Sequence, residues 1–128
     1  MAETEKITIN MSVVDLGKID LLVEEGFYQN RTDFIRTAIR IKLEQHEPAV
    51  QSSVVRNAFG MGVFGYSRKE LEDTLAKGDR KRINVIGMLI LHNDVTPEIA
   101  DKAIESIQVH GVFKAPAGVK DVLKDRMR

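Results

Sequence analysis

Polar and apolar side chains alternate near the start of the chain, in residues 6–12 (KITINMS). In an extended strand this alternation puts Lys6, Thr8 and Asn10 on one face and apolar side chains on the other. Lysine and asparagine can hydrogen-bond to guanine and adenine in a DNA major groove, and threonine can contact base edges too. A two-stranded ribbon fits into that groove. The spacing therefore favours a surface that reads double-stranded DNA.

Such a strand needs a partner, because one strand cannot pair its own backbone groups. No second strand follows within hairpin reach. The simplest partner is the same strand of a second copy, paired antiparallel about a two-fold axis. The alternative is an ordinary edge strand whose Lys-Thr-Asn face is only solvated surface.

Two helices are predicted after the strand. Ser12 is a good N-cap for a helix over about 13–25, and Gly26 can end it in the left-handed conformation. Asn30 caps a second helix over about 31–46. The apolar residues of this second helix occupy more than one stripe: Phe34, Ile35, Ala38, Ile39, Ile41 and Leu43. Since the first helix can cover only one side, we expect the second helix of a partner subunit to cover the rest.

The run KITINMS, a helix ending in Gly26, and then FYQNRTDFIRTAIR resembles the ribbon-helix-helix family of bacterial and archaeal DNA-binding regulators. The resemblance covers residues 5–46. It implies an intertwined homodimer whose ribbon enters the major groove. It also implies two sets of DNA-contacting residues, the base-reading Lys6, Thr8 and Asn10 and the phosphate-binding Asn30, Arg31 and Thr32.

The start of the second helix suits a phosphate on physical grounds as well. Backbone amides at a helix start, with the positive end of the dipole behind them, favour an anion. Arg31 can add a charge-assisted hydrogen bond there. Arg36 and Arg40 are expected to pair with Asp20, Glu24 or Glu25 on the first helix; the alternative is contact with DNA.

Composition places the chain among globular proteins, at 43% hydrophobic and 30% charged residues with zero net charge. Residues 1–46 hold six basic and eight acidic residues, so any basic DNA-binding footprint must be local. Without cysteine there is no disulfide or thiolate metal site. No stretch suggests a membrane span or a secretory signal. We expect a cytoplasmic, nucleoid-associated protein of a bacterium or archaeon.

The expected fold class is α+β, in three parts. Residues 1–46 are the DNA-binding and dimerisation domain. Residues 47–53 are a linker, because Pro48 stops the preceding helix and small polar residues follow. Residues 54–128 are a small β/α-repeat domain with a parallel sheet.

An internal repeat supports the last assignment. Residues 83–89 match residues 107–113 in pattern at a spacing of 24, and Gly65 is a candidate third copy. Helix-like stretches follow the strands at 68–77, 97–106 and 117–127. The strands resemble short leucine-rich-type solenoid turns, stacked in parallel. An unpaired end strand favours higher oligomerisation or a protein partner.

Other kinds of site are not indicated. The glycine-rich residues 57–65 lack a phosphate-loop pattern and favour a bent strand. His46, His92 and His110 are isolated, so no metal or other cofactor is expected. No catalytic constellation appears, so an enzyme is not expected. Residues 78–82 (GDRKR) read as a solvated charged turn, or alternatively as an auxiliary nucleic-acid contact.

The function expected from these features is that of a homodimeric transcriptional regulator, acting as a repressor by occupying an operator. Two alternatives remain open. One is an antitoxin-like module that binds a protein and contacts DNA to regulate itself. The other is a scaffolding protein that kept the dimer fold and lost DNA binding.

Overall fold

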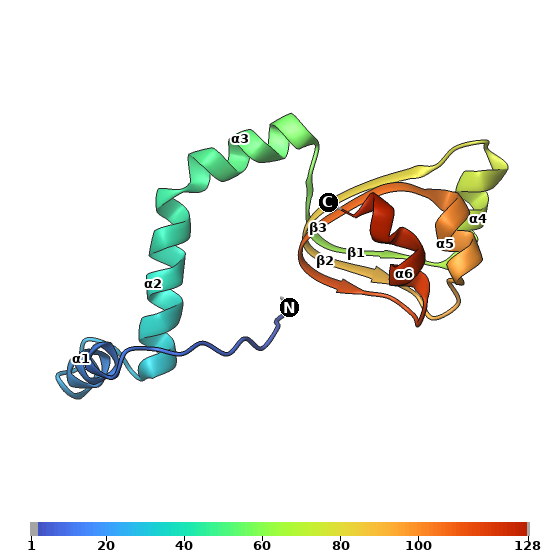
Figure 1. The fold of residues 1–128 in the computed structure, drawn as a ribbon. Coiled ribbons are helices and arrows are strands. Elements are labelled where there is room, and N and C mark those ends of the chain that lie inside the picture. Colours follow the sequence, from blue (N-terminus) through green and yellow to red (C-terminus); the bar gives the residue numbers. More distant parts are fainter. Residues whose placement is uncertain (1–2, 128) are drawn as a thin grey trace. The chain divides into compact units, whose positions relative to one another are not determined.

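A computed structural model of the chain describes residues 3–127 and divides into two compact units, residues 4–52 and residues 53–127 (Figure 1). The first unit contains two complete helices. The second contains a three-stranded parallel sheet with its own helices. The predicted α+β class is confirmed.

The N-terminal unit begins with an extended segment and continues as α1 (Val13–Glu24) and α2 (Arg31–Gln45). Residues 3–12 form no regular secondary structure in the single chain. The strand expected at residues 6–12 is therefore absent from one chain alone, because a strand exists only when a second strand pairs with it. Its pairing with a second copy stays a prediction.

Side-chain caps begin both helices at the predicted residues. The Ser12 hydroxyl accepts a hydrogen bond from the Asp15 amide, and the Asn30 side chain accepts one from the Asp33 amide at 2.8 Å. Gly26 follows α1 with a φ of +88°, the left-handed conformation that glycine adopts without strain. The local sequence thus determines where α1 and α2 begin and where α1 ends.

Residues 47–53 were predicted to be an irregular linker, and this prediction of their structure is wrong. These residues belong to a helix, α3 (Glu47–Asn57), which begins directly after the break at His46. Pro48 does end α2, but it lies in the first turn of α3. The missing proline N–H costs nothing there, because first-turn amides have no partner within the helix.

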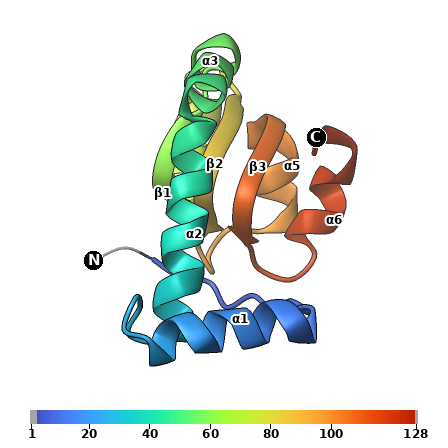
Figure 2. The same ribbon diagram turned by 90° about the vertical axis from the view of Figure 1, so that its left-hand side faces the viewer.

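The C-terminal unit is the predicted β/α repeat. Its sheet has the parallel order β1-β2-β3, and the helices lie together on one side of it (Figures 1 and 2). The strands are β1 (Gly60–Tyr66), β2 (Lys81–Leu91) and β3 (Ile104–Lys114). The helices are α4 (Arg68–Ala76), α5 (Pro97–Ala103), α6 (Val119–Leu123) and the 3-10 helix η1 (Lys124–Arg126).

One face of this sheet packs on the helices and forms the core. The fully or nearly buried side chains come from β2, from β3 and from all three α-helices, and include Ile83, Val85, Leu89, Ile104, Ile107, Leu71, Ala100 and Leu123. Parallel strands joined through helices bury their apolar side chains in this way. The repeat therefore builds its core by stacking, as expected.

The third copy of the repeat is centred on Gly62, and the alignment with Gly65 is wrong. In the sheet Gly62 lies beside Gly87, and Gly87 beside Gly111. The φ angles of the three are +136°, +134° and +125°. A Cβ on Gly87 would lie 2.1 Å from the Gly62 carbonyl oxygen. The strands therefore share one bend, at a position where only glycine fits.

Two predicted helices are shorter than expected. The stretch 97–106 is helical only to Ala103, since Ile104 already belongs to β3. The stretch 117–127 is divided between α6 and η1. Met127 then forms an isolated parallel bridge with Ile107, on β3. These ends are set by entry into the sheet, which local helix propensity does not record.

Candidate nucleic-acid interface

The predicted base-reading residues lie on an open segment. Lys6, Thr8 and Asn10 are all exposed. Within residues 3–127 the backbone of residues 6–10 makes no hydrogen bond, and neither do the side chains of these three residues. The segment is not paired within its own chain, so its backbone groups are available to a second strand.

The opposite side of the same segment is apolar and also uncovered. Ile7 is 75% exposed and Ile9 63% exposed. Within residues 4–52 the only buried side chain is Ile19, on α1. The exposed apolar side chains of α2 are Ile39, Ile41 and Leu43. A unit of this size with one buried side chain leaves much of its apolar surface in water, which is unfavourable unless another protein surface covers it.

The start of α2 presents backbone amides. The side chains of Asn30 and Asp33 cap it reciprocally, since the Asp33 carboxylate accepts from the Gln29 amide at 3.0 Å. The Asn30 side chain is thus occupied by the cap. The amides of Arg31 and Thr32 lie in the first turn, where no helical carbonyl can reach them. They are the groups that an anion would meet.

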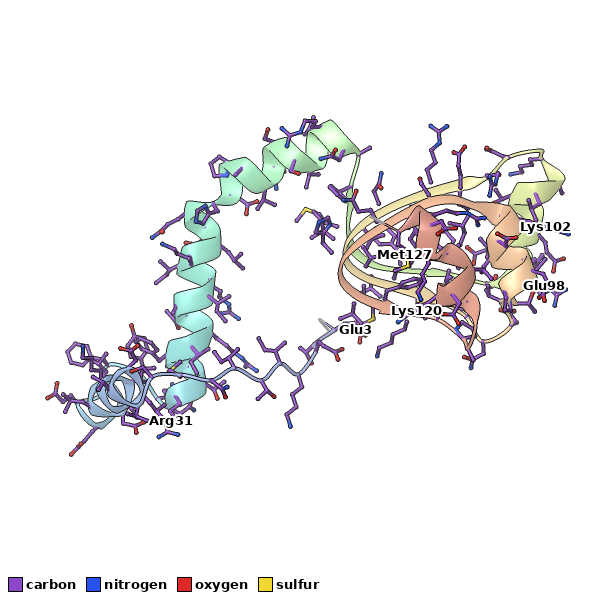
Figure 3. All side chains as sticks on the ribbon, in the orientation of Figure 1. Glu3, Arg31, Glu98, Lys102, Lys120 and Met127 are labelled. Carbon is purple, nitrogen blue, oxygen red and sulfur yellow. The ribbon has the colours of Figure 1, made fainter. Side chains whose placement is uncertain are left out.

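The Arg31 side chain is used within the unit. Its Nε and terminal nitrogen lie 2.7 and 2.8 Å from the two carboxylate oxygens of Asp20, where α1 and α2 meet (Figure 3). The hydrogen bond from Arg31 lowers the pKa of the Asp20 carboxyl, and the same contact raises the pKa of Arg31. Sequence reasoning gave this pairing to Arg36 or Arg40, and that expectation is wrong.

Arg36 and Arg40 instead line a shallow polar groove beside the start of α2. Among the described residues no carboxylate lies within ion-pair distance of either guanidinium. The other residues that line the groove are Gln29, Asn30, Thr32, Asp33 and Thr37. Two unpaired positive charges, those of Arg36 and Arg40, therefore lie next to the free amides of α2.

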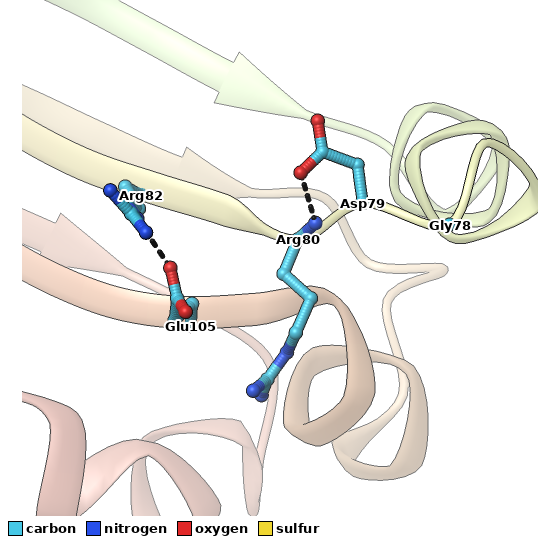
Figure 4. A pocket seen from close by; sticks show the side chains of 5 residues that line it. All are labelled: Gly78, Asp79, Arg80, Arg82 and Glu105. Atoms are coloured by element: carbon cyan, nitrogen blue, oxygen red, sulfur yellow. Dashed lines mark hydrogen bonds and ion pairs between the residues drawn. The ribbon is translucent and has the colours of Figure 1, made fainter.

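The charged turn at residues 78–82 is not simply solvated. The Arg80 guanidinium donates to the carbonyl oxygens of Lys102, Asp101 and Ile104, at 2.9 to 3.2 Å. Arg82 forms an ion pair with Glu105 beside it (Figure 4). Both arginines already have protein acceptors, which leaves them poorly suited to the alternative role of auxiliary nucleic-acid contacts.

Two further observations concern other classes of protein. Within residues 3–127 no three His, Asp or Glu side chains come together as metal ligands would. None of the helices in that range is both long and apolar enough to span a bilayer.

Comparison with known proteins extends the resemblance of the first residues to most of the chain. No curated protein and no solved structure matches it. A family model described as the Ribbon-Helix-Helix transcriptional regulator family matches residues 2–120 and so includes most of the C-terminal unit. Sequence reasoning had limited the resemblance to residues 5–46. The caps, the open segment and this match together show that the chain belongs to the ribbon-helix-helix transcriptional regulator family.

Proposed function

We propose that this chain is a homodimeric, sequence-specific DNA-binding repressor. In the dimer, residues 6–12 of two copies pair as an antiparallel ribbon that enters the major groove. The observation that carries the proposal is the open segment itself. Its backbone is unpaired, its polar side is exposed, and its apolar side lacks the cover that a partner's helices would supply.

The contacts divide into those that read bases and those that set position. Lys6, Thr8 and Asn10 would face base edges from each strand of the ribbon, with Asn10 suited to adenine and Lys6 to guanine. The free amides of Arg31 and Thr32 would hold a backbone phosphate, and Asn30 would keep those amides in place as the helix cap.

The charge distribution limits how the protein can bind. Only Lys6 is basic on the polar side of the strand, and the Arg31 side chain is paired with Asp20. Lys6 and the unpaired Arg36 and Arg40 beside the start of α2 can neutralise only a few phosphates per subunit, so non-specific affinity should be modest. Occupancy of an operator would then depend on base contacts and on neighbouring dimers, in the cytoplasm at the chromosome.

The base-reading role is tested with the double change Thr8→Ala with Asn10→Ala in the full chain. DNA fragments retained by the purified protein are sequenced for wild type and variant. Each lost contact is worth about 1–3 kcal/mol of discrimination, so the preferred sequence should disappear. The control is Gln51→Ala with Ser52→Ala, two exposed polar residues of α3. Retention of the wild-type preference by the ribbon variant, with the dimer mass unchanged, would contradict the proposal.

A salt series on random DNA separates this proposal from a scaffolding role. A phosphate-contacting protein loses affinity linearly on a log–log plot as salt rises. A negligible, flat signal together with no selected sequence would support a scaffold. Selected DNA that is released when a protein partner binds would support the antitoxin-like alternative.

A further inference from the structure

Helices cover one face of the C-terminal sheet. Residues 57–59 cover one end of the other face, where the Asn84 side chain donates to the Asn57 carbonyl oxygen and the Phe59 ring packs on the His110 ring. Strand alternation directs six apolar side chains to this other face, which we term the open face: Met61, Val63, Ile86, Met88, Ile90 and Val112. Met88, on the central strand, is only 5% exposed, and Ile86, Ile90 and Val112 are half-buried. The sheet register places Val63, Met88 and Val112 side by side across the three strands. None of the six belongs to the core that packs on the helices. Met61 and Val63 are each 52% exposed.

A parallel sheet with helices on one face only is unusual, because parallel sheets occur almost only with both faces covered. The helices α4, α5 and α6 pack on the face opposite the open face, through Leu71, Ala100 and Leu123. Residues 57–59 cover only one end of the open face, so cover for the exposed Met61 and Val63 must come from elsewhere.

We propose that the open face packs against the open face of a second copy of this chain, the copy held in the same dimer by the N-terminal unit. This inference rests on the dimer of the proposed function. It adds a second contact between the subunits, through the C-terminal units.

The size of the open face fits a tethered copy. Seven register rows over three strands cover about 23 Å by about 14 Å, or roughly 300 Å² on each copy, at ~3.3 Å per residue and ~4.8 Å per strand. A stable independent interface needs about 800 Å² on each partner. A face this small therefore suits a partner that is already attached, since linkage supplies an effective concentration of about a millimolar.

The charges also fit a second copy. The open face contains no Asp, Glu, Lys or Arg at its centre, where the exposed His110 lies beside Ile86, so two identical faces can meet without fixed like charges opposite one another. At one end Arg82 and Glu105 neutralise each other within the chain. At the other end Lys114 lies beside Ile90 and remains exposed. No charge has to be buried unpaired when the faces meet.

The test uses the absence of cysteine from the chain. Val63→Cys is introduced into the full chain and treated with a short bismaleimide at low protein concentration. Asp73→Cys, at an exposed position of α4 on the covered side, is the matched control. We expect most of the Val63→Cys protein to become a covalent dimer and little of the control. Adding Val112→Glu to Val63→Cys should reduce cross-linking about tenfold, because a charge is then buried without a partner.

Light scattering on the same samples separates the two proposals. A dimer mass with no cross-linking above the control would overturn the face-to-face contact and leave the N-terminal dimer standing. A monomer mass would overturn both. Cross-linked species of tetramer mass would place the contact between dimers and overturn the tethered arrangement. If Val112→Glu does not fold, as judged by circular dichroism, Met61→Lys at the exposed edge of the face replaces it, with the same expectation.

Discussion

Gly87 is the residue on which the C-terminal sheet depends most. It lies between Gly62 and Gly111 in neighbouring strands, and its φ is +134°. Changing Gly87→Ala places a Cβ 2.1 Å from the Gly62 carbonyl oxygen, which is backbone and cannot move away cheaply. Steric overlap and left-handed strain together should cost about 3 kcal/mol or more. Urea denaturation of the full chain measures this loss.

Gly65→Ala is the matched control for Gly87→Ala. Its φ is not positive, and the atom nearest to an added Cβ is on the exposed His92 ring, which can rotate away. We expect a change of at most about 1 kcal/mol. Equal losses at the two positions would mean that the shared bend does not restrict residue type.

Asp20 decides whether the Arg31 guanidinium is available to DNA at the start of α2. Because its carboxylate holds the Arg31 guanidinium, Asp20→Asn should release Arg31 toward a phosphate. Two new phosphate contacts per dimer would steepen the slope of log affinity against log salt by about 1.8. The slope is measured on the selected operator. Glu24→Gln, on the same helix and outside the ion pairs of residues 3–127, is the control and should leave it nearly unchanged.

The same ion pair should make the protein sensitive to acid. The hydrogen bond from Arg31 lowers the pKa of Asp20 below its ordinary 3.8, so the folded state binds this proton more weakly than the unfolded state. The stabilisation is therefore complete above about pH 4 and is lost as pH falls through the lowered pKa. The melting temperatures of wild type and Asp20→Asn should differ near pH 6, and the difference should shrink as the pH falls below 3.8. A constant difference would contradict this assignment.

At the scale of elements, two arginines complete the end of α5. Arg80 donates to three carbonyl oxygens there, and Arg126, from η1, donates to two of the same ones, those of Asp101 and Ile104. The last carbonyls of a helix lack partners within it, and cationic donors stabilise them. The charged turn before β2 and the 3-10 helix at the end of the chain are therefore joined through α5.

Arg80→Ala should consequently destabilise the full chain by about 1–2 kcal/mol, since the carbonyl oxygens lose charge-assisted donors. Arg82→Ala is the neighbouring control. Its ion pair with Glu105 is largely exposed, with 76% of the Arg82 side chain in water, so its loss should cost at most about 0.5 kcal/mol. Chemical denaturation compares the two variants, and an equal or larger loss for Arg82→Ala would refute the role given to Arg80.

Sequence reasoning succeeded where an element depends on adjacent residues. Ser12, Asn30 and Gly26 predicted the ends of α1 and α2 because caps act within one turn. It failed at Pro48, since proline is as compatible with a helix start as with a helix stop. It also aligned the third repeat on Gly65, although the run GVF at 62–64 recurs at 111–113. The correct alignment depends on contacts between strands.

At the scale of the whole molecule, sequence reasoning is limited because the proposed site requires a second copy of the chain. The polar face of residues 6–12 can be identified from alternation alone, but a single chain leaves that segment without a strand. The Arg31–Asp20 pair was missed for a related reason, because the angle between two helices decides which of three arginines reaches the acid. Local patterns identify the candidate site residues, and packing decides which of their groups remain free.

Within residues 4–52 only the Ile19 side chain is buried. We therefore expect the N-terminal unit to be stably folded only when a second copy covers its apolar surface. Its thermal midpoint should then rise with protein concentration, because association and folding are linked. Ile41→Glu puts a charge on the exposed apolar side of α2, where burial against a partner would leave it unpaired. We expect this variant to lose dimer mass in light scattering and operator binding together.

Val55→Glu is the control for Ile41→Glu. Val55 is 81% exposed on α3, outside the surfaces proposed for dimer formation, and the same charge should be tolerated there. If Ile41→Glu kept the dimer mass while the midpoint stayed independent of concentration, the apolar side of α2 would not be an interface. The ribbon would then lack the second strand that it needs, and residues 6–12 could not read DNA as proposed.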